Sequence, residues 1–232
     1  MFVSLVAPSI FPDYYEFPLL LVAVALLALM VLVLSPGAYW QKGKAPMAIR
    51  MPLVLIFAFT LSLNALWFTG GSGEVVLKER NFYGSLRVQK VDSFIQMVSG
   101  RISHGLQVMP PGDPMTPTSY FHEQTVLPIV FDSVRDDRGR RSAVLGLGAG
   151  TMAVYTESED TMRFIEINPL VGMMAQTYFS FLTEARGEIK LDIGDGRKRL
   201  QEEEPGSLDV IMVDAFTGDS VPVHLLTWEA YL

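Results

Sequence analysis

The strongest constraint on the fold is an alternation of apolar strands and helical stretches after Arg141. Four short apolar runs read as strands, namely "SAVLGL", "MRFIEI", "EIKLDI" and "LDVIMVDAF". Two stretches between them read as helices, "PLVGMMAQTYFSFL" and "GRKRLQEEE". Such alternation predicts an α/β fold with a parallel, doubly wound sheet. Ligands of these sheets bind beyond the carboxyl ends of the strands, so a site is expected there.

The first predicted strand leads into a glycine-rich turn and then a helix, in "VLGLGAGTMAVY". Gly146, Gly148 and Gly150 allow the backbone to turn tightly and to approach a ligand beside a helix N-terminus. Turns of this kind hold nucleotides. The fourth residue of "GLGAG" is Ala149, whose methyl group has no chemistry to offer.

The other three strands each end near an acidic residue. Glu166 ends the second strand, where a carboxylate can accept hydrogen bonds from both hydroxyls of a ribose. Asp195, followed by Gly196, comes after the third strand in "GDGR" and can accept from an adenine amino group. Asp214 ends the fourth strand, at the usual position of a catalytic or substrate-binding acid, and Asp219 follows in the next loop.

Two ligand classes fit these strand ends. A dinucleotide is one, because "GAGTMA" matches G-x-G-x-x-A and Glu166 lies at a plausible distance from it. That ligand leaves Asp195 and Asp214 without a role, whereas a nucleoside bound across all four ends uses each acid. We therefore favour S-adenosylmethionine or its decarboxylated form, which carries no phosphate, as a co-substrate.

Charge and composition argue against other classes. Three of the 18 basic and two of the 25 acidic residues precede Glu74. The chain from Glu74 onward therefore has 15 basic and 23 acidic residues, and this net negative charge repels a nucleic acid backbone. The chain has no cysteine, and its three histidines, His104, His122 and His224, show no metal-ligand spacing. We expect no nucleic acid partner, no metal and no prosthetic group.

The N-terminal region is strongly apolar and predicts about two transmembrane helices, near 17–35 and 52–69. "FPLLLVAVALLALMVLVL" has 18 residues and no charge, and "PLVLIFAFTLSLNALWF" is the second candidate. A buried core helix is the alternative for each. Basic residues on both sides of the second span leave the orientation open. The adenosyl ligand favours a cytoplasmic domain on a multi-pass protein of the bacterial inner membrane, with the lipid bilayer as a partner.

The motifs "VLGLGAG", "FIEINP", "GDGR" and "DVIMVDAFTGD" together resemble the spermidine synthase (polyamine aminopropyltransferase) family. "RNFYGSLRV", "HGLQ", "PTSYF", "GLGAGT" and "DAFTGDSVPVHLLTWEA" resemble a bacterial branch of it that is fused to membrane helices. The resemblance covers roughly Glu79 to Leu232. It implies a methyltransferase-like Rossmann fold behind a small β-domain. It also implies aminopropyl transfer from decarboxylated S-adenosylmethionine to a polyamine, and a homodimer.

The resemblance also assigns roles to individual residues. It places Gln107 and His122 near the nucleoside and its thioether, Glu166 on the ribose, Asp195 on the adenine, and Asp214 opposite the attacking amine. In this reaction a neutral amine attacks the carbon next to the sulfonium, and methylthioadenosine leaves. Carboxylates suit the removal of the amine proton, and they attract a polyamine cation.

The amine half of the site departs from the family pattern. Ala149 stands where an Asp grips the amino end of the ligand, and Thr217 stands where a second Asp accepts the proton. Phe121 replaces a Tyr, with Tyr120 beside it. Tyr120 and Thr217 are the expected substrate-binding residues, and Asp219 is a candidate replacement acid. A methyltransferase-like reaction on S-adenosylmethionine and a non-catalytic adenosyl-ligand sensor at the membrane stay open.

Three regions follow from this reading. Residues 1–73 form the transmembrane region and a glycine-rich hinge, 74–117 a small β-rich domain with a proline-rich loop, and 118–232 the Rossmann-like domain. The chain ends just inside the helix expected after the fourth strand, where sheets of this class usually continue. Either it is a fragment, or the sheet is shortened and another chain covers its edge.

Overall fold

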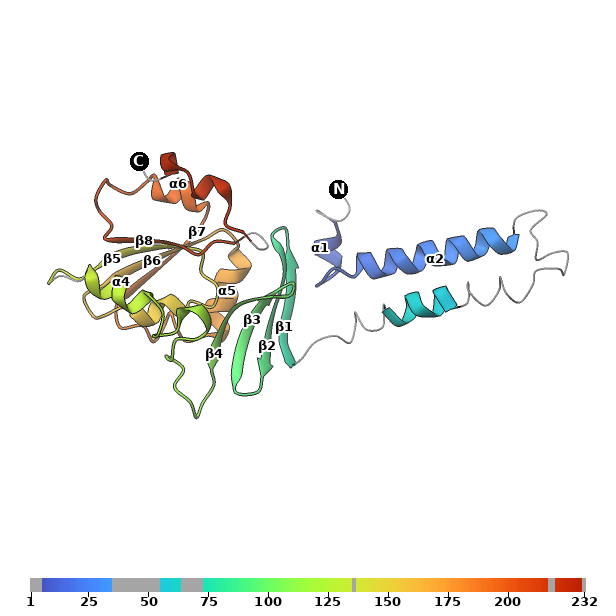
Figure 1. Ribbon diagram of the computed structural model, residues 1–232, viewed down its shortest axis with the longest axis horizontal. Helices are drawn as coiled ribbons and strands as arrows, with labels where there is room; N and C mark the ends of the chain where they lie inside the picture. Colours follow the sequence, from blue (N-terminus) through green and yellow to red (C-terminus); the bar gives the residue numbers. More distant parts are fainter. Residues whose placement is uncertain (1–5, 35–54, 64–72, 135–136, 217–219, 231–232) are drawn as a thin grey trace. The chain divides into compact units, whose positions relative to one another are not determined.

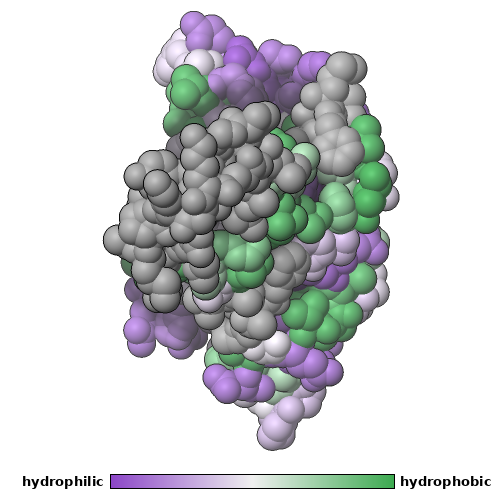
Figure 2. All heavy atoms as spheres, turned by 90° about the vertical axis from the view of Figure 1, so that its right-hand side faces the viewer, coloured by the Kyte–Doolittle hydropathy of each residue, from purple (hydrophilic) through white to green (hydrophobic). Residues whose placement is uncertain are grey.

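A computed structural model of the chain describes all residues except 1–5, 35–54, 64–72, 135–136, 217–219 and 231–232 (Figure 1). The chain divides into two compact units, Met1–Ser72 and Gly73–Leu232. The described residues of the first unit are mainly helical: α1 covers Ala7–Ile10, α2 covers Glu16–Leu34, and a further helix covers 55–63. Apolar side chains of α2 such as Leu20 and Leu27 are exposed. Figure 2 shows hydrophobic side chains in several patches on the face that it draws.

The predicted transmembrane helices near 17–35 and 52–69 are wrong. Within the described ranges, no helix is both long enough and apolar enough to cross a membrane. A crossing takes about 20 apolar residues in one helix, and the described part of the second predicted span is helical over 55–63. Residues 35, 52–54 and 64–69 of the two predicted spans lie outside the described residues. This finding also contradicts the predicted multi-pass location.

The second unit contains the predicted parallel sheet. Its strands are β5 (Arg141–Leu145), β6 (Thr161–Glu166), β7 (Glu188–Ile193) and β8 (Val210–Val213), in the order β7-β6-β5-β8. The chain starts at the inner strand β5, moves outward through β6 and β7, and returns to the other side of β5. The strand order therefore reverses between β5 and β8, which is the point where doubly wound sheets bind ligands.

An antiparallel sheet precedes the parallel one. Its strands are β1 (Glu74–Asn81), β2 (Gly84–Val91), β3 (Phe94–Ser99) and β4 (Ile102–Val108), which pair in chain order through three hairpins. The register shifts between Met97 and Val98, where β3 pairs with β4. The proline-rich stretch after β4 is irregular, as its composition predicts.

The prediction of a separate small β-domain is wrong, because the two sheets share one hydrophobic core. The antiparallel sheet contributes Leu86, Val88 and Met97 to this core, and the parallel sheet contributes Val144, Met162 and Phe164. A sheet with one apolar face must bury that face against another layer. Here the covering layer is the parallel sheet with its helices, so residues 73–232 form one compact unit.

Both faces of the parallel sheet are covered. On the side of the antiparallel sheet lie α4 (Leu127–Ser133), α5 (Pro169–Tyr178) and the 3-10 helices η2 (Ser119–Phe121) and η3 (Thr151–Tyr155). The other face packs Ala143, Leu145 and Ile165 against Leu200 and Leu225. These last two belong to α6 (Gly196–Leu200) and η4 (Val223–Leu225), and η5 (Trp228–Ala230) follows. Double-sided burial explains why the inner strand β5 is buried at every position after Arg141.

The three predicted helices are shorter than their sequence patterns indicate, and α5 and α6 end at Tyr178 and Leu200, before the ends of their predicted stretches. The helix after the glycine turn is only the five-residue η3, because the Thr156 hydroxyl donates to the carbonyl oxygen of Ala153 at 2.7 Å and ends it. The segment before the parallel sheet forms two separate helices, η2 and α4. Pro128 stands in the first turn of α4, a position that tolerates proline but interrupts a longer helix.

A buried ion pair fixes the amino-terminal edge of the sheet. Arg140 is 1% exposed and pairs with Asp160, and it donates to the carbonyl oxygens of Phe131 at 2.9 Å and Tyr155 at 2.7 Å. Burial alone raises the pKa of Asp160. The hydrogen bonds from Arg140 and from the amide of Glu157, together with the Arg140 charge, outweigh burial and hold this pKa below its usual value.

We expect Asp160→Asn to lower the free energy of unfolding by about 3–5 kcal/mol, because it leaves the buried Arg140 charge without a partner. The exposed pair Arg186–Glu157 provides the control, and Arg186→Ala should cost less than about 1 kcal/mol. Urea unfolding of the full chain measures both. Similar small losses in the two variants would contradict the assigned importance of the buried pair.

Candidate active site

The carboxyl ends of three parallel strands are locked together by backbone contacts. The amide of Gly146 donates to the carbonyl oxygen of Ile165 at 2.8 Å, and the amide of Asp214 donates to that of Leu145 at 2.8 Å. The ends of β5, β6 and β8 therefore meet at one edge of the sheet. This edge carries the glycine turn and the predicted acidic residues.

The glycine turn needs glycine at the positions where other backbone presses on it. Gly146 has φ +97°, and a Cβ there would stand 2.4 Å from the carbonyl oxygen of Asp214. Gly148 has φ +54°, and its Cβ would stand 2.3 Å from the carbonyl oxygen of His104 in β4. The turn is thus held between β8 on one side and the antiparallel sheet on the other.

Ala149 has a packing role in this turn. Its amide donates to the carbonyl oxygen of His104 at 3.0 Å, and its side chain is 1% exposed. A Cβ on Gly105 would stand only 2.6 Å from the Ala149 Cβ. Each of these two residues must therefore be small for β4 to lie on the turn, and the side chain at 149 faces protein.

Glu166 connects the end of β6 to the glycine turn. Its carboxylate is 8% exposed and accepts from the amides of Leu147 at 3.0 Å and Asn168 at 2.8 Å. Burial raises the pKa of Glu166, and the backbone hydrogen bonds partly oppose that increase. A carboxylate offers about four acceptor positions, so two backbone donors leave acceptor capacity for a further ligand.

Asn168 extends this network to the antiparallel sheet. Its Oδ1 accepts from the amide of Leu170, which caps α5, and from Nδ2 of Asn81 at 2.6 Å. Asn81 ends β1, and the exposed rings of Phe82 and Tyr83 follow it in the turn to β2. The Asn-Pro pair at the start of α5 is a helix N-terminus signal that marks Asn168. Nothing local marks Asn81, whose partner is 87 residues away.

Asp195 and Gly196 follow β7 and begin α6. The Asp195 carboxylate accepts from the amide of Lys198 at 3.1 Å, and the side chain remains partly exposed. A Cβ on Gly196 would stand 3.2 Å from Leu145, so the backbone here lies close to the end of β5. The start of α6 therefore lies beside the carboxyl end of β5, the strand that leads into the glycine turn.

Tyr120 and Asp214, 94 residues apart, form a hydrogen-bonded pair at the same edge. The Tyr120 hydroxyl donates to Oδ2 of Asp214 at 3.3 Å. Burial raises the pKa of Asp214 to about 6, and the hydrogen bond from Tyr120 works in the opposite direction. Burial and the negative charge of Asp214 raise the pKa of Tyr120, so the tyrosine stays a neutral donor.

Other predicted site residues lie elsewhere or are engaged by protein. Gln107 is buried: its Nε2 donates to Pro114 O at 3.1 Å and Ser180 Oγ at 3.0 Å, and its Oε1 accepts from the Ser180 amide. His122 is partly exposed, and its Nδ1 accepts from the Gln124 amide at 3.2 Å. Thr217 and Asp219 lie outside the described residues.

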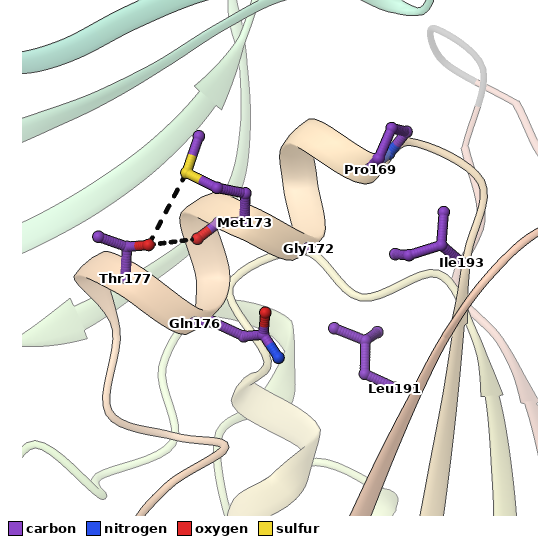
Figure 3. A pocket seen from close by; sticks show the side chains of 7 residues that line it. All are labelled: Pro169, Gly172, Met173, Gln176, Thr177, Leu191 and Ile193. Carbon is purple, nitrogen blue, oxygen red and sulfur yellow. Dashed lines mark hydrogen bonds between the residues drawn. The ribbon is translucent and has the colours of Figure 1, made fainter.

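A groove of about 310 Å³ lies between α5 and the edge strand β7 (Figure 3). It is lined by Pro169, Gly172, Met173, Gln176, Thr177, Leu191 and Ile193. Thr177 turns its hydroxyl back to the carbonyl oxygen of Met173 at 2.7 Å. No predicted site residue lines this groove, and its lining has no titratable side chain, so we place the candidate active site at the strand ends.

The strand order, the glycine turn and the acidic strand ends define a Rossmann-like fold of the methyltransferase and spermidine synthase type. The chain is homologous to spermidine synthase: it is 26% identical over 188 residues to the polyamine aminopropyltransferase of Vibrio vulnificus (strain CMCP6). The match covers 77% of this chain and 60% of that protein. No model of a protein family matches the chain.

One solved structure shares the fold, and a second relative matches part of the sequence. The structure of a probable spermidine synthase from Corynebacterium glutamicum ATCC 13032 superposes with a TM-score of 0.51 and 18% identity, over 69% of this chain and 58% of that one. An N-terminal histidine N-methyltransferase of Emericella nidulans is 38% identical over 101 residues, which is 41% of this chain and 17% of that protein. The chain thus spans about three fifths of the spermidine synthase relatives, and these matches do not address the membrane-fused branch.

We expect Gly146→Ala to destabilise the fold by more than the roughly 1–2 kcal/mol that a left-handed conformation costs a residue with a Cβ, because this Cβ also meets the Asp214 backbone. Gly206→Ala is the matched control, since Gly206 has φ +73° but open space around its Cβ position. Thermal unfolding compares the two variants. Equal losses would show that the packing of β5 on β8 at Gly146 is unimportant.

Proposed function

We propose that the protein is a transferase that moves an aminopropyl group from decarboxylated S-adenosylmethionine to a polyamine. The observation that carries the proposal is the Tyr120–Asp214 pair at the point where the strand order reverses. Homology to polyamine aminopropyltransferase supports the same reaction class. Because the chain spans only part of those relatives, the reaction and both substrates are proposed for this chain.

In this proposal the nucleoside lies across the ends of β5, β6 and β7. Glu166 accepts hydrogen bonds from the ribose hydroxyls with the acceptor capacity that its two backbone donors leave. Asp195 accepts from the adenine amino group, and Gly196 lets the backbone approach the ring. The turn at Gly146, Gly148 and Gly150 brings backbone close to the sulfonium end without the side chains that a bulkier turn would place there.

The reaction is then a displacement at the carbon next to the sulfonium. The amine nitrogen forms a bond to this carbon, the carbon–sulfur bond breaks, and its electron pair stays on sulfur as neutral methylthioadenosine leaves. The amine proton passes to the Asp214 carboxylate. A carboxyl group whose pKa is raised to about 6 accepts a proton more readily near neutral pH than an ordinary aspartate does. Tyr120 orients it.

Methyl transfer from S-adenosylmethionine is the second candidate, and Ala149 favours it. The Ala149 side chain is apolar and buried against Gly105, so it offers no carboxylate to the ammonium group of an aminopropyl tail. The similarity of 101 residues to an N-terminal histidine N-methyltransferase agrees with this alternative. The nucleoside contacts are the same in both reactions.

Asp214→Asn should abolish transfer and leave nucleoside binding nearly unchanged. In the unaltered protein, turnover should rise with pH through about 6 as the Asp214 carboxyl ionises. Because the folded pKa lies above the usual 3.8, the wild type loses stability as the pH rises from 3.8 to about 6. The variant should therefore gain stability relative to wild type over that range.

The control for this variant is Asp209→Asn. Asp209 stands just before β8, at the amino-terminal end of the strand and therefore away from the candidate site. Its carboxylate accepts from the Arg141 amide, and an asparagine oxygen can replace it. Turnover at several pH values and thermal unfolding are the measurements. Full turnover in Asp214→Asn would exclude the assigned proton acceptor.

Calorimetric titration of the full chain separates the two candidate reactions. We expect decarboxylated S-adenosylmethionine to bind at least about tenfold more tightly than S-adenosylmethionine, a difference of about 1.4 kcal/mol, and methylthioadenosine to bind as well. The opposite preference would favour methyl transfer. Binding of none of the three would contradict the adenosyl site at the strand ends.

A further inference from the structure

We propose that Tyr155 is a positioning residue that holds Tyr120 against Asp214. The residue stands at the end of η3 and has no assigned place in the site. The inference rests on the proposed function in that it treats Asp214 as the reacting acid. The structural basis is a line of contacts that runs from the buried Arg140 to Asp214, through Tyr155, Phe121 and Tyr120.

Tyr155 is held firmly at its own end of this line. Its ring stacks on Phe131, with 5.7 Å between ring centroids and 11° between ring planes. Its carbonyl oxygen accepts from the Arg140 guanidinium at 2.7 Å. Arg140 in turn lies over the Phe131 ring, 5.1 Å from its centroid. A tyrosine fixed by its backbone and its ring face presents its hydroxyl in one direction.

That hydroxyl donates to the carbonyl oxygen of Phe121 in η2. The turn needs this support, because Ser119 has φ +57°, a left-handed conformation that costs a residue with a Cβ about 1–2 kcal/mol. The Thr118 hydroxyl donates to Leu106 O and holds the other end of the turn. Phe121 itself is buried in the shared core.

Phe121 passes this constraint to Tyr120. The two rings lie 4.2 Å apart between centroids, so the buried ring of Phe121 supports the half-exposed ring of Tyr120. The Tyr120 hydroxyl then reaches Asp214. Loss of the Tyr155 hydroxyl leaves the carbonyl oxygen of Phe121 without this hydrogen bond. The hydrogen bond between Tyr120 and Asp214 is already long, at 3.3 Å, so a small shift of Tyr120 breaks it.

The groups that face the two ends of the line are few. Among described side chains, Tyr120 is the titratable group whose interaction moves the pKa of Asp214. At the other end, burial and the charge of Glu123 raise the pKa of Tyr155, so this hydroxyl stays protonated and remains a donor. The bond from Tyr120 lowers the pKa of Asp214, so breaking it must raise that pKa.

The test is a pH titration of the Asp214 side-chain carboxyl by carbon-13 NMR on the full chain. We expect Tyr155→Phe and Tyr120→Phe each to raise the Asp214 pKa above the wild-type value, and the double variant to raise it no further than Tyr120→Phe alone. Non-additivity follows because Tyr155 acts through Tyr120. The NMR titration does not require turnover. The positioning role of Tyr155 can therefore be tested independently of the proposed reaction.

Tyr178→Phe is the matched control, since Tyr178 packs against the same core as Tyr155 and lies at the end of α5. It should leave the Asp214 titration unchanged. If Tyr155→Phe does not fold, Phe131→Leu removes the stacked ring and should shift the Asp214 pKa in the same direction. A wild-type Asp214 pKa in Tyr155→Phe, or in Phe131→Leu where it replaces that variant, would overturn the inference.

Where turnover is present, Tyr155→Phe should lower kcat by about 10- to 100-fold, the range expected for a small misplacement of a reacting group. The KM for the adenosyl substrate should stay near its wild-type value, because Glu166 and Asp195 are untouched. If Tyr155 had only a structural role, Tyr155→Phe would instead lower the midpoint of thermal unfolding and would not lower kcat selectively relative to KM.

Discussion

The contact between β4 and the glycine turn is the constraint on which the rest of the site depends. The Ala149 amide donates to His104 O, and Gly105 and Gly148 have no room for side chains where the two segments touch. Because of this contact the antiparallel sheet lies against the parallel one, and the two share a core. A larger residue at 105 would push the sheets apart, and the turn would lose the support that shapes it.

The pKa of each buried acid near the strand ends depends on how far hydrogen bonds and positive charge offset the cost of burying its carboxylate. Asp160 meets a buried arginine and becomes more acidic than usual, which suits a structural role. Glu166 and Asp214 are also removed from water, but backbone amides and one tyrosine hydroxyl compensate them less. Their pKa values therefore rise. Acids left in this state at a sheet edge are available for ligand binding and for proton transfer.

Much of the fold was accessible from the sequence because its signals are local. Apolar runs followed by glycine or acidic residues located β5 to β8, and their alternation with helices predicted the parallel sheet. The N-terminal region misled the same reasoning: its apolar runs predicted membrane spans, whereas no helix among the described residues is both long enough and apolar enough to cross a membrane. Helix ends depended on side-chain contacts such as Thr156 with Ala153, which composition does not reveal.

By itself the sequence determined which residues stand at the ends of the strands, since each strand is read from its own residues. It therefore predicted Glu166, Asp195, Asp214 and the glycine turn as neighbours. Only the tertiary structure decided the partners: Tyr120 for Asp214, Asn81 for Asn168, and Gly105 for Ala149. These pairs join segments far apart in the chain, and their distances depend on how the two sheets pack, which no local pattern encodes.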